Sequence, residues 1–159
     1  MKVLAVLDAD DTMWDVAAPI WDRAVREARG DLLVLSDGAE LRLRPEVRPG
    51  LMALKARGIL LAVASHNLDL PEAGVKGALK ALGIDDLFDF VMVRNSSDKN
   101  AMIGDICAKL DVDMVEDRVF FTDDSGRHVE NARRIGADAQ IAGASIQSFF
   151  DAVLEAASR

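Results

Sequence analysis

The chain has 159 residues, half of them hydrophobic, which is enough for one globular domain with a buried core and excludes a disordered protein. Its 27 acidic and 19 basic residues give a net charge of −8 with no basic cluster, which argues against binding to the phosphate backbone of nucleic acid. One cysteine excludes an internal disulfide and a cysteine-rich zinc site. No apolar run approaches the roughly 20 residues of a membrane helix or forms a signal peptide, so we expect a cytoplasmic protein without a membrane partner.

The first predicted element is a strand over residues 3–7, where five consecutive apolar residues are typical of a strand buried on both faces of a parallel sheet. Three carboxylates follow it, those of Asp8, Asp10 and Asp11. Ligands of open α/β sheets bind just beyond the carboxyl ends of the strands. Asp8 and Asp10 are one side-chain period apart, so in an extended chain they face the same side. Two like charges so close predict a divalent cation.

The next segment is predicted to be a small insert. Apolar residues at helical spacing over residues 16–29 predict a helix. Two short strands at 32–36 and 41–44 flank an Asp-Gly turn and predict a hairpin. We therefore expect residues 15–48 to form a flap within a single domain that spans residues 1–159.

The rest of the chain alternates strands and helices. Short apolar runs predict strands at 59–64, 90–93, 119–121 and 139–142. Helical spacing of apolar residues predicts helices at 49–57, 71–82, 102–110, 127–135 and 146–154. Such alternation predicts parallel strands joined by right-handed crossovers. The expected fold is a three-layer α/β/α Rossmann-like domain around a parallel five-stranded sheet.

Polar side chains follow each of the first four strands of this sheet, and their carboxyl ends meet at one edge. The set is Asp8, Asp10, Ser65, Lys99, Asp123 and Asp124. Each type has a role in phosphoryl transfer. A carboxylate can attack phosphorus, and a second can donate a proton and then activate water. A hydroxyl and an ammonium can bind the phosphoryl oxygens, and further carboxylates can hold Mg²⁺.

Each of these residues also has a purely structural interpretation. Ser65 could cap a turn, and Asp124 or Ser125 could cap the following helix. Lys99 could be a solvated lysine, but a cation at a helix N-terminus opposes the helix dipole and makes sense where an anion binds. The two histidines, His66 and His128, are expected at the polar rim of the site and not as catalysts. Trp14 is expected to wall the pocket or flap, or to pack in the core.

A family resemblance follows from these motifs. Asp8-Ala9-Asp10-Asp11-Thr12, Ser65, Lys99 and Asp123-Asp124 match the four motifs of the haloacid dehalogenase superfamily in order and spacing. Within it, the runs 7–14, 41–47 and 120–124 and the Ala64-Ser65 tip resemble the magnesium-dependent phosphatase family.

The resemblance implies roles for the site. Asp8 would be the nucleophile and Asp10 the acid and base. Ser65 and Lys99 would bind the phosphoryl group, and we expect His66 and Asn67, at the same tip as Ser65, to contact the substrate. The metal ligands for Mg²⁺ would be the Asp8 carboxylate, the Asp10 main-chain carbonyl and Asp123 or Asp124.

The sequence also departs from that family. Asp11 stands at a position where the resembled family has Tyr. That family also has an arginine-rich stretch after the paired aspartates, and Arg127 is its one counterpart here. The specificity of that family for protein tyrosine or sugar phosphates is therefore not expected of this chain. The predicted protein is a Mg²⁺-dependent phosphatase that hydrolyses a phosphorylated small molecule or a phosphoprotein through an aspartyl-phosphate, as a monomer or homodimer. Dehalogenases of the superfamily lack the counterpart of Asp10.

Two other readings of the sequence stay open. The tip of residues 65–67 and the paired aspartates also resemble domains that load a glyceryl group onto carrier proteins. A catalytically silent binding domain is the third possibility.

Overall fold

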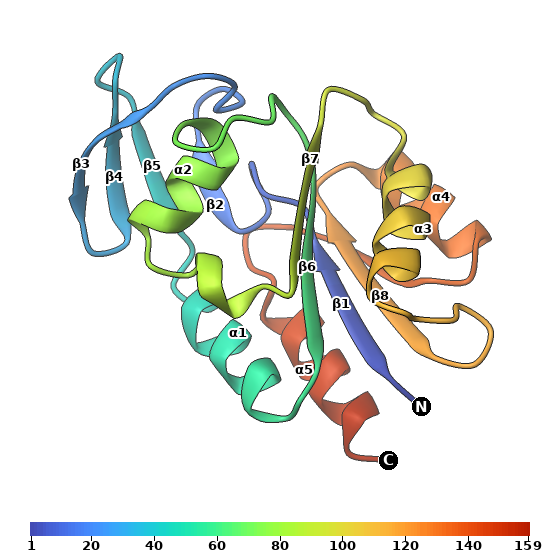
Figure 1. Ribbon diagram of the computed structural model, residues 1–159. Helices are drawn as coiled ribbons and strands as arrows, with labels where there is room; N and C mark the ends of the chain where they lie inside the picture. Colours follow the sequence, from blue (N-terminus) through green and yellow to red (C-terminus); the bar gives the residue numbers. More distant parts are fainter.

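The larger of two sheets is parallel and five-stranded, in the order β7-β6-β1-β8-β9 (Figure 1). The computed structural model describes residues 1–159. The strands of this sheet are β1 (Val3–Leu7), β6 (Leu60–His66), β7 (Phe90–Arg94), β8 (Arg118–Asp123) and β9 (Asp138–Ile141). Every neighbouring pair is parallel, as the alternation of strands and helices predicts.

Helices cover both faces of this sheet, which confirms the predicted three-layer α/β/α fold. They are α1 (Val47–Ala56), α2 (Gly74–Ala81), α3 (Lys99–Lys109), α4 (Gly126–Arg134) and α5 (Gln147–Ala157), with a short 3₁₀ turn η1 (Asp85–Leu87). Helices α1, α2 and α5 pack on one face, and α3 and α4 pack on the other (Figure 1).

The sequence of the central strand, β1, explains why both faces of the five-stranded sheet are buried. Ala5 and Leu7 of β1 belong to the core under α1, α2 and α5, whereas Leu4 and Val6 belong to the core under α3 and α4. Successive side chains of a strand point to opposite faces. A continuous apolar run is therefore the sequence that a strand between two helical layers requires.

The second sheet, here called the flap sheet, is antiparallel and lies beside α2 (Figure 1). Its strands are β2 (Trp14–Val16), β3 (Val25–Arg29), β4 (Leu32–Leu35) and β5 (Glu40–Leu43), in the order β2-β5-β4-β3. The hairpin of β4 and β5 confirms the two strands predicted there. Alternate leucines, Leu33 and Leu35 in β4 and Leu41 and Leu43 in β5, are buried in the main core.

The helix predicted over residues 16–29 is wrong. Val25 to Arg29 pairs with β4 as an edge strand, because its side chains are half-buried or exposed and it gains ladder hydrogen bonds there. In the preceding loop the carbonyls of Ala18 and Pro19 accept hydrogen bonds from the Arg23 guanidinium, where a helix would use backbone N–H groups. The apolar spacing was coincidental.

Smaller boundary differences bear on the site. Strand β6 runs two residues beyond the predicted 59–64, so Ser65 and His66 are its last residues. Helix α1 begins at Val47, two residues before the predicted start, and α2 begins at Gly74 and not at Pro71. Gly50 lets α1 approach α5 closely, since a Cβ there would lie 2.6 Å from the Phe150 ring.

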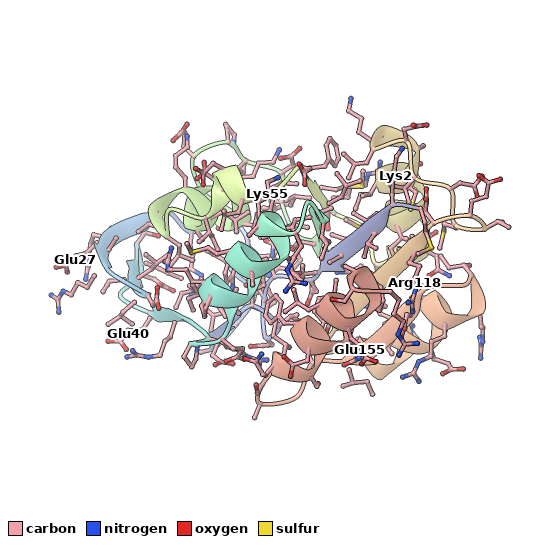
Figure 2. The ribbon with its side chains drawn as sticks, turned by 90° about the horizontal axis from the view of Figure 1, so that it is seen from below. Lys2, Glu27, Glu40, Lys55, Arg118 and Glu155 are labelled. Carbon is pink, nitrogen blue, oxygen red and sulfur yellow. The ribbon has the colours of Figure 1, made fainter.

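The end of the molecule opposite the site carries charges of both signs. Figure 2 shows Lys2, Lys55 and Arg118 together with Glu155 at this end. None of the helices combines the length and the apolar character needed to cross a bilayer.

Candidate active site

A polar hollow of about 160 Å³ lies where the carboxyl ends of the central strands meet. It is lined by Asp8, Asp10, Asp11, Pro19, Ser65, His66, Lys99, Asp123, Asp124, Ser125 and His128. The hollow has room for several waters, or for a phosphoryl group beside a small ion. A larger group attached to that phosphoryl would remain outside.

The chain turns sharply after β1 and aims Asp8 into this hollow. The N–H groups of Thr12 and Met13 both donate to the Ala9 carbonyl, and Asp11 adopts a positive φ of 58°. Aspartate tolerates this conformation better than most residues. The Thr12 hydroxyl donates to Asp8 Oδ2 at 3.0 Å, so the turn fixes the carboxylate as well as the backbone.

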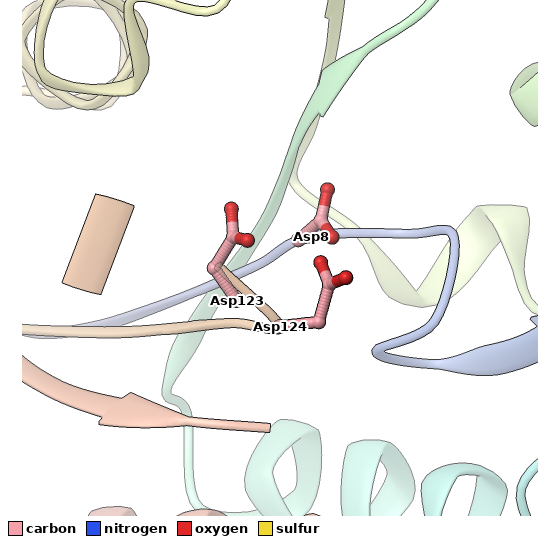
Figure 3. A group of neighbouring side chains, drawn as sticks. All are labelled: Asp8, Asp123 and Asp124. Carbon is pink, nitrogen blue, oxygen red and sulfur yellow. The ribbon is translucent and has the colours of Figure 1, made fainter. Parts of the chain in front are cut away.

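Three carboxylates converge at the ends of β1 and β8. Asp8, Asp123 and Asp124 each offer an oxygen, and these oxygens all lie within 4.8 Å of one another. Figure 3 shows the three side chains reaching into one space from the two neighbouring segments. Asp8 and Asp123 are buried, whereas Asp124 is exposed. The predicted metal residues Asp8, Asp123 and Asp124 are thus together, and the Asp10 carboxylate is not among them.

Lys99 is the buried cation of this cluster. It is the first residue of α3 and is 3% exposed. Its Nζ lies 2.8 Å from Asp8 Oδ1 and 3.2 Å from Asp123 Oδ2, and it donates to the Ala64 carbonyl at 2.5 Å. Burial by itself would lower the pKa of Lys99, but the two carboxylates outweigh it and hold this pKa above its ordinary value. Lys99 therefore stays charged.

The pKa of Asp8 lies near neutral pH. Burial, assisted by the charges of Asp123 and Asp124, raises the pKa of Asp8 from 3.8 to about 7, although Lys99 opposes the shift. The order of these causes matters, because one ammonium does not compensate for the removal of a carboxylate from water. A further cation beside Asp8 would favour its ionised form.

Asp10 accepts three hydrogen bonds from groups outside the hollow. Trp14 Nε1 donates to its Oδ1 at 2.7 Å, and the Ile20 N–H and Asn67 Nδ2 donate to its Oδ2 at 3.0 and 2.9 Å. Burial raises the pKa of Asp10, and the three donors partly offset that rise. An elevated pKa suits a group that delivers and then recovers a proton.

The three residues expected to bind substrate from the end of β6 separate into two groups. Ser65 and His66 line the hollow. Asn67 does not; it is 1% exposed and lies behind Asp10. His66 contacts Trp21 edge to face at 5.7 Å between ring centroids and lies 3.3 Å from the Asn95 amide oxygen, at the rim.

The residues that follow β8 separate the role of helix cap from that of metal ligand. Ser125 caps α4, because its hydroxyl accepts the His128 N–H at 3.4 Å. Asp124 is therefore not needed as the cap. Although Asp124 is exposed as a residue, the partial desolvation of its carboxylate and the charge of Asp123 raise its pKa. The His128 ring nitrogen Nδ1 lies 3.2 Å from Asp123 Oδ2, so this histidine borders the acidic cluster.

Sequence reasoning missed Arg44, a buried arginine that joins three parts of the site. Its guanidinium donates to the carbonyls of Asp11 and Gly143 at 2.9 and 2.7 Å and pairs with Asp15 at 3.1 Å. It thereby fixes the loop after β1 against the flap sheet and the segment before α5. One signal was present: an arginine at the end of an alternating apolar strand has to find buried partners.

The donor set of the acidic cluster fits Mg²⁺. Carboxylate oxygens are the hard ligands that this ion prefers, and it binds through few protein groups while it keeps several waters. The hollow holds five carboxylates against one lysine. This excess of negative charge would repel a phosphate dianion unless a cation were bound.

Comparisons with known proteins agree with this geometry. A model of the family described as haloacid dehalogenase-like hydrolases matches residues 8–142. No curated protein matches the chain.

Solved structures resemble the fold. An uncharacterized protein from Listeria monocytogenes serotype 4b is 20% identical with a TM-score of 0.64, covering 87% of this chain and 77% of the other. CbbY from Rhodobacter sphaeroides in complex with phosphate is 18% identical with a TM-score of 0.61, covering 89% and 86%. A predicted phosphoglycolate phosphatase from Haemophilus somnus is 28% identical with a TM-score of 0.52, covering 64% of this chain and 44% of its own. Dehalogenases also resemble it.

Proposed function

This chain belongs to the haloacid dehalogenase-like hydrolases, and we propose that it is a Mg²⁺-dependent phosphatase of phosphate monoesters. The observation that carries the proposal is the convergence of Asp8, Asp123 and Asp124 within 4.8 Å beside the buried Lys99. Asp8 stands between a fixed ammonium and the two acids that would share a metal ion with it. Such a site offers a nucleophile next to compensation for the charge of a phosphoryl group.

The first half-reaction transfers the phosphoryl group to the protein. An Asp8 carboxylate oxygen forms a bond to phosphorus as the bond from phosphorus to the ester oxygen breaks. Asp10 gives its proton to that departing oxygen, so the alcohol leaves uncharged. Lys99 and the Ser65 hydroxyl bind phosphoryl oxygens in this proposal. Mg²⁺, when held by Asp8, Asp124 or Asp123 and the Asp10 carbonyl, supplies positive charge against the phosphoryl oxygens.

The second half-reaction restores the carboxylate. The Asp10 carboxylate takes a proton from water, and the water oxygen bonds to phosphorus while the bond to Asp8 breaks. Inorganic phosphate leaves, and Asp8 is again ionised. One residue thus acts first as acid and then as base. Burial raises the pKa of Asp10 above its ordinary value, which favours the protonated form that the first step uses.

The size of the hollow favours substrates whose bulk stays outside. A volume of about 160 Å³ accommodates the phosphoryl group and little else. The proposed substrates are therefore phosphorylated small molecules or phosphoproteins, with the ester group extending past Pro19 and His66 at the rim. The carboxylate of Asp11, also at the rim, disfavours an anionic ester group.

Asp10 is the reason to prefer a phosphatase to a dehalogenase. A departing halide needs no proton, so in that reaction the carboxylate held beside the nucleophile by three hydrogen bonds would have no role as an acid. A departing alcohol does need one.

Hydrolysis of 4-nitrophenyl phosphate tests the proposal. Wild type, Asp8→Asn and the matched control Asp86→Asn, an exposed aspartate in η1, would be assayed in Mg²⁺ and in EDTA. We expect wild type and Asp86→Asn to turn over only with Mg²⁺, and Asp8→Asn not at all. Hydrolysis that survives EDTA or the loss of Asp8 would contradict the proposal. Chloride release from 2-chloropropionate without ester hydrolysis would identify a dehalogenase.

A further inference from the structure

The hydrogen bonds to Asp10 are divided unequally between its two oxygens. Oδ2 accepts from the Ile20 N–H at 3.0 Å and from Asn67 Nδ2 at 2.9 Å, while Oδ1 accepts only from Trp14 Nε1 at 2.7 Å. A carboxylate oxygen has about two lone-pair sites in its plane. Oδ2 is therefore saturated, and Oδ1 keeps one site free.

Both side-chain donors are rigidly held. Trp14 is fully buried, and its carbonyl accepts the Asp11 N–H at 2.8 Å, so it is fixed to the loop that carries Asp10. Asn67 is 1% exposed, and its backbone N–H donates to the Arg94 carbonyl at 2.9 Å.

The amide orientation of Asn67 follows from its other contact. The Leu68 N–H donates to Asn67 Oδ1 at 3.3 Å, which leaves Nδ2 as the group facing Asp10. The carboxylate is thus clamped from β2 on one side and from the end of β6 on the other.

We infer that Trp14 and Asn67 are positioning residues that orient Asp10 so that its Oδ1 is the atom that exchanges protons during catalysis. This inference rests on the proposed phosphatase function. In the first step the O–H bond at Oδ1 breaks and its electron pair stays on Asp10. The proton joins the ester oxygen, which receives the electron pair of the breaking bond to phosphorus. In the second step the same oxygen accepts a proton from water.

The clamp, formed by Trp14, Asn67 and the Ile20 N–H, orients the Asp10 carboxyl group and stabilises the negative charge that Asp10 carries after it gives up its proton. After the proton leaves, the negative charge of Asp10 keeps three N–H donors that were already in place, so no reorganisation is needed. Without one of them the carboxylate can rotate away from the ester oxygen. Small displacements of a reacting group lower rates by up to about a hundredfold.

Two esters of similar size separate this role from a purely structural one. The oxygen of 4-nitrophenol leaves without a proton at neutral pH, whereas that of benzyl alcohol must be protonated. The experiment measures kcat/KM for 4-nitrophenyl phosphate and benzyl phosphate, because this ratio reports on the steps up to phosphoryl transfer. The variants are Trp14→Phe, which removes the indole N–H, and Asn67→Ala. The matched controls are Asn131→Ala, in α4, and Phe149→Leu, a buried aromatic residue of α5; neither residue contacts Asp10 or lines the hollow.

We expect both variants to lose about tenfold or more on benzyl phosphate and less than about threefold on 4-nitrophenyl phosphate. The controls should keep the wild-type ratio of the two rates. In an Asp10→Asn background, Asn67→Ala should change neither rate further, since residues that act as a unit are not additive.

Several results would overturn the inference. Equal losses on both esters, or no loss, would show that the clamp is structural only. If wild type hydrolyses 4-nitrophenyl phosphate through Asp8 but never hydrolyses benzyl phosphate, then Asp10 does not protonate the leaving oxygen and the inference is wrong. Failure of the proposed function itself is distinct, because then neither ester is hydrolysed by wild type in Mg²⁺. Should Trp14→Phe unfold, Asn67→Ala, checked by thermal unfolding, carries the test.

Discussion

Asp8→Asn should stabilise the metal-free protein while abolishing turnover. The amide is close to isosteric with the carboxylate. Its oxygen can accept from Lys99, which lies 2.8 Å from Oδ1, and its NH₂ group can donate to the Thr12 hydroxyl, which now donates to Oδ2. The change removes a charge that the fold tolerates poorly and keeps the hydrogen-bonding positions filled.

The magnitude follows from the pKa of Asp8. Burial raises it from 3.8 to about 7, so the folded protein holds this proton more tightly than the unfolded chain does. Stability therefore falls as the pH rises from about 4 to about 7, because the unfolded state releases the proton first. Linkage gives a loss of about 2 kcal/mol at pH 5 and about 4 kcal/mol at pH 8 relative to a neutral side chain.

Thermal unfolding in EDTA measures this loss directly. Asp8→Asn should melt above wild type by roughly 10 °C at pH 8, with a smaller gap at pH 5. Addition of Mg²⁺ should narrow the gap, because only wild type keeps the full set of ligands. An Asp8→Asn protein less stable than wild type at pH 8, or a gap that shrinks as the pH rises, would refute this account of the Asp8 charge.

Four further changes test other parts of the structure. Lys99→Met should destabilise the metal-free protein by about 3–5 kcal/mol at pH 8, less at pH 5, since it leaves two buried carboxylates uncompensated; denaturant unfolding measures this. Arg44→Met should cost about 2–3 kcal/mol in the same assay by leaving two carbonyls without donors. Gly50→Ala should cost about 1–3 kcal/mol, because its Cβ would meet the Phe150 ring at 2.6 Å. Asp124→Asn should weaken the rise in melting temperature on Mg²⁺ addition without lowering stability in EDTA.

The architecture of the large sheet was predictable because each of its elements has a local cause. The run Val3–Leu7 is apolar without interruption, which only a strand with both faces covered requires. The helix predicted over 16–29 failed for a non-local reason. Val25–Arg29 is stabilised by pairing with β4, and the turn before it is held by Asp10 and Arg23. Helical spacing in a short polar segment could not reveal those partners.

The candidate site divides along the same line. Asp8, Ser65, Lys99 and Asp123 could be predicted as site residues because each follows a predicted strand. The topology of a parallel sheet brings the carboxyl ends of its strands together. The position of Asn67 could not be predicted, since its partner is 57 residues away and only the packing of β6 beside β1 determines that they meet. The contact between Arg44 and the Gly143 carbonyl spans 99 residues and was equally hidden.

The charged groups of the site lower the stability of the metal-free fold and also supply the nucleophile for the proposed reaction. Asp8 would be more stable protonated, and Asp124 is pushed the same way by burial and by Asp123. Lys99 supplies one positive charge, which is already shared by two carboxylates. The remaining negative charge can be relieved by protons or by a divalent cation, and these alternatives have opposite consequences. Protons on Asp8 remove the nucleophile, whereas a cation keeps it ionised. Stability of the metal-free fold should therefore fall as the pH rises from about 4 to 7, and added Mg²⁺ should offset that fall.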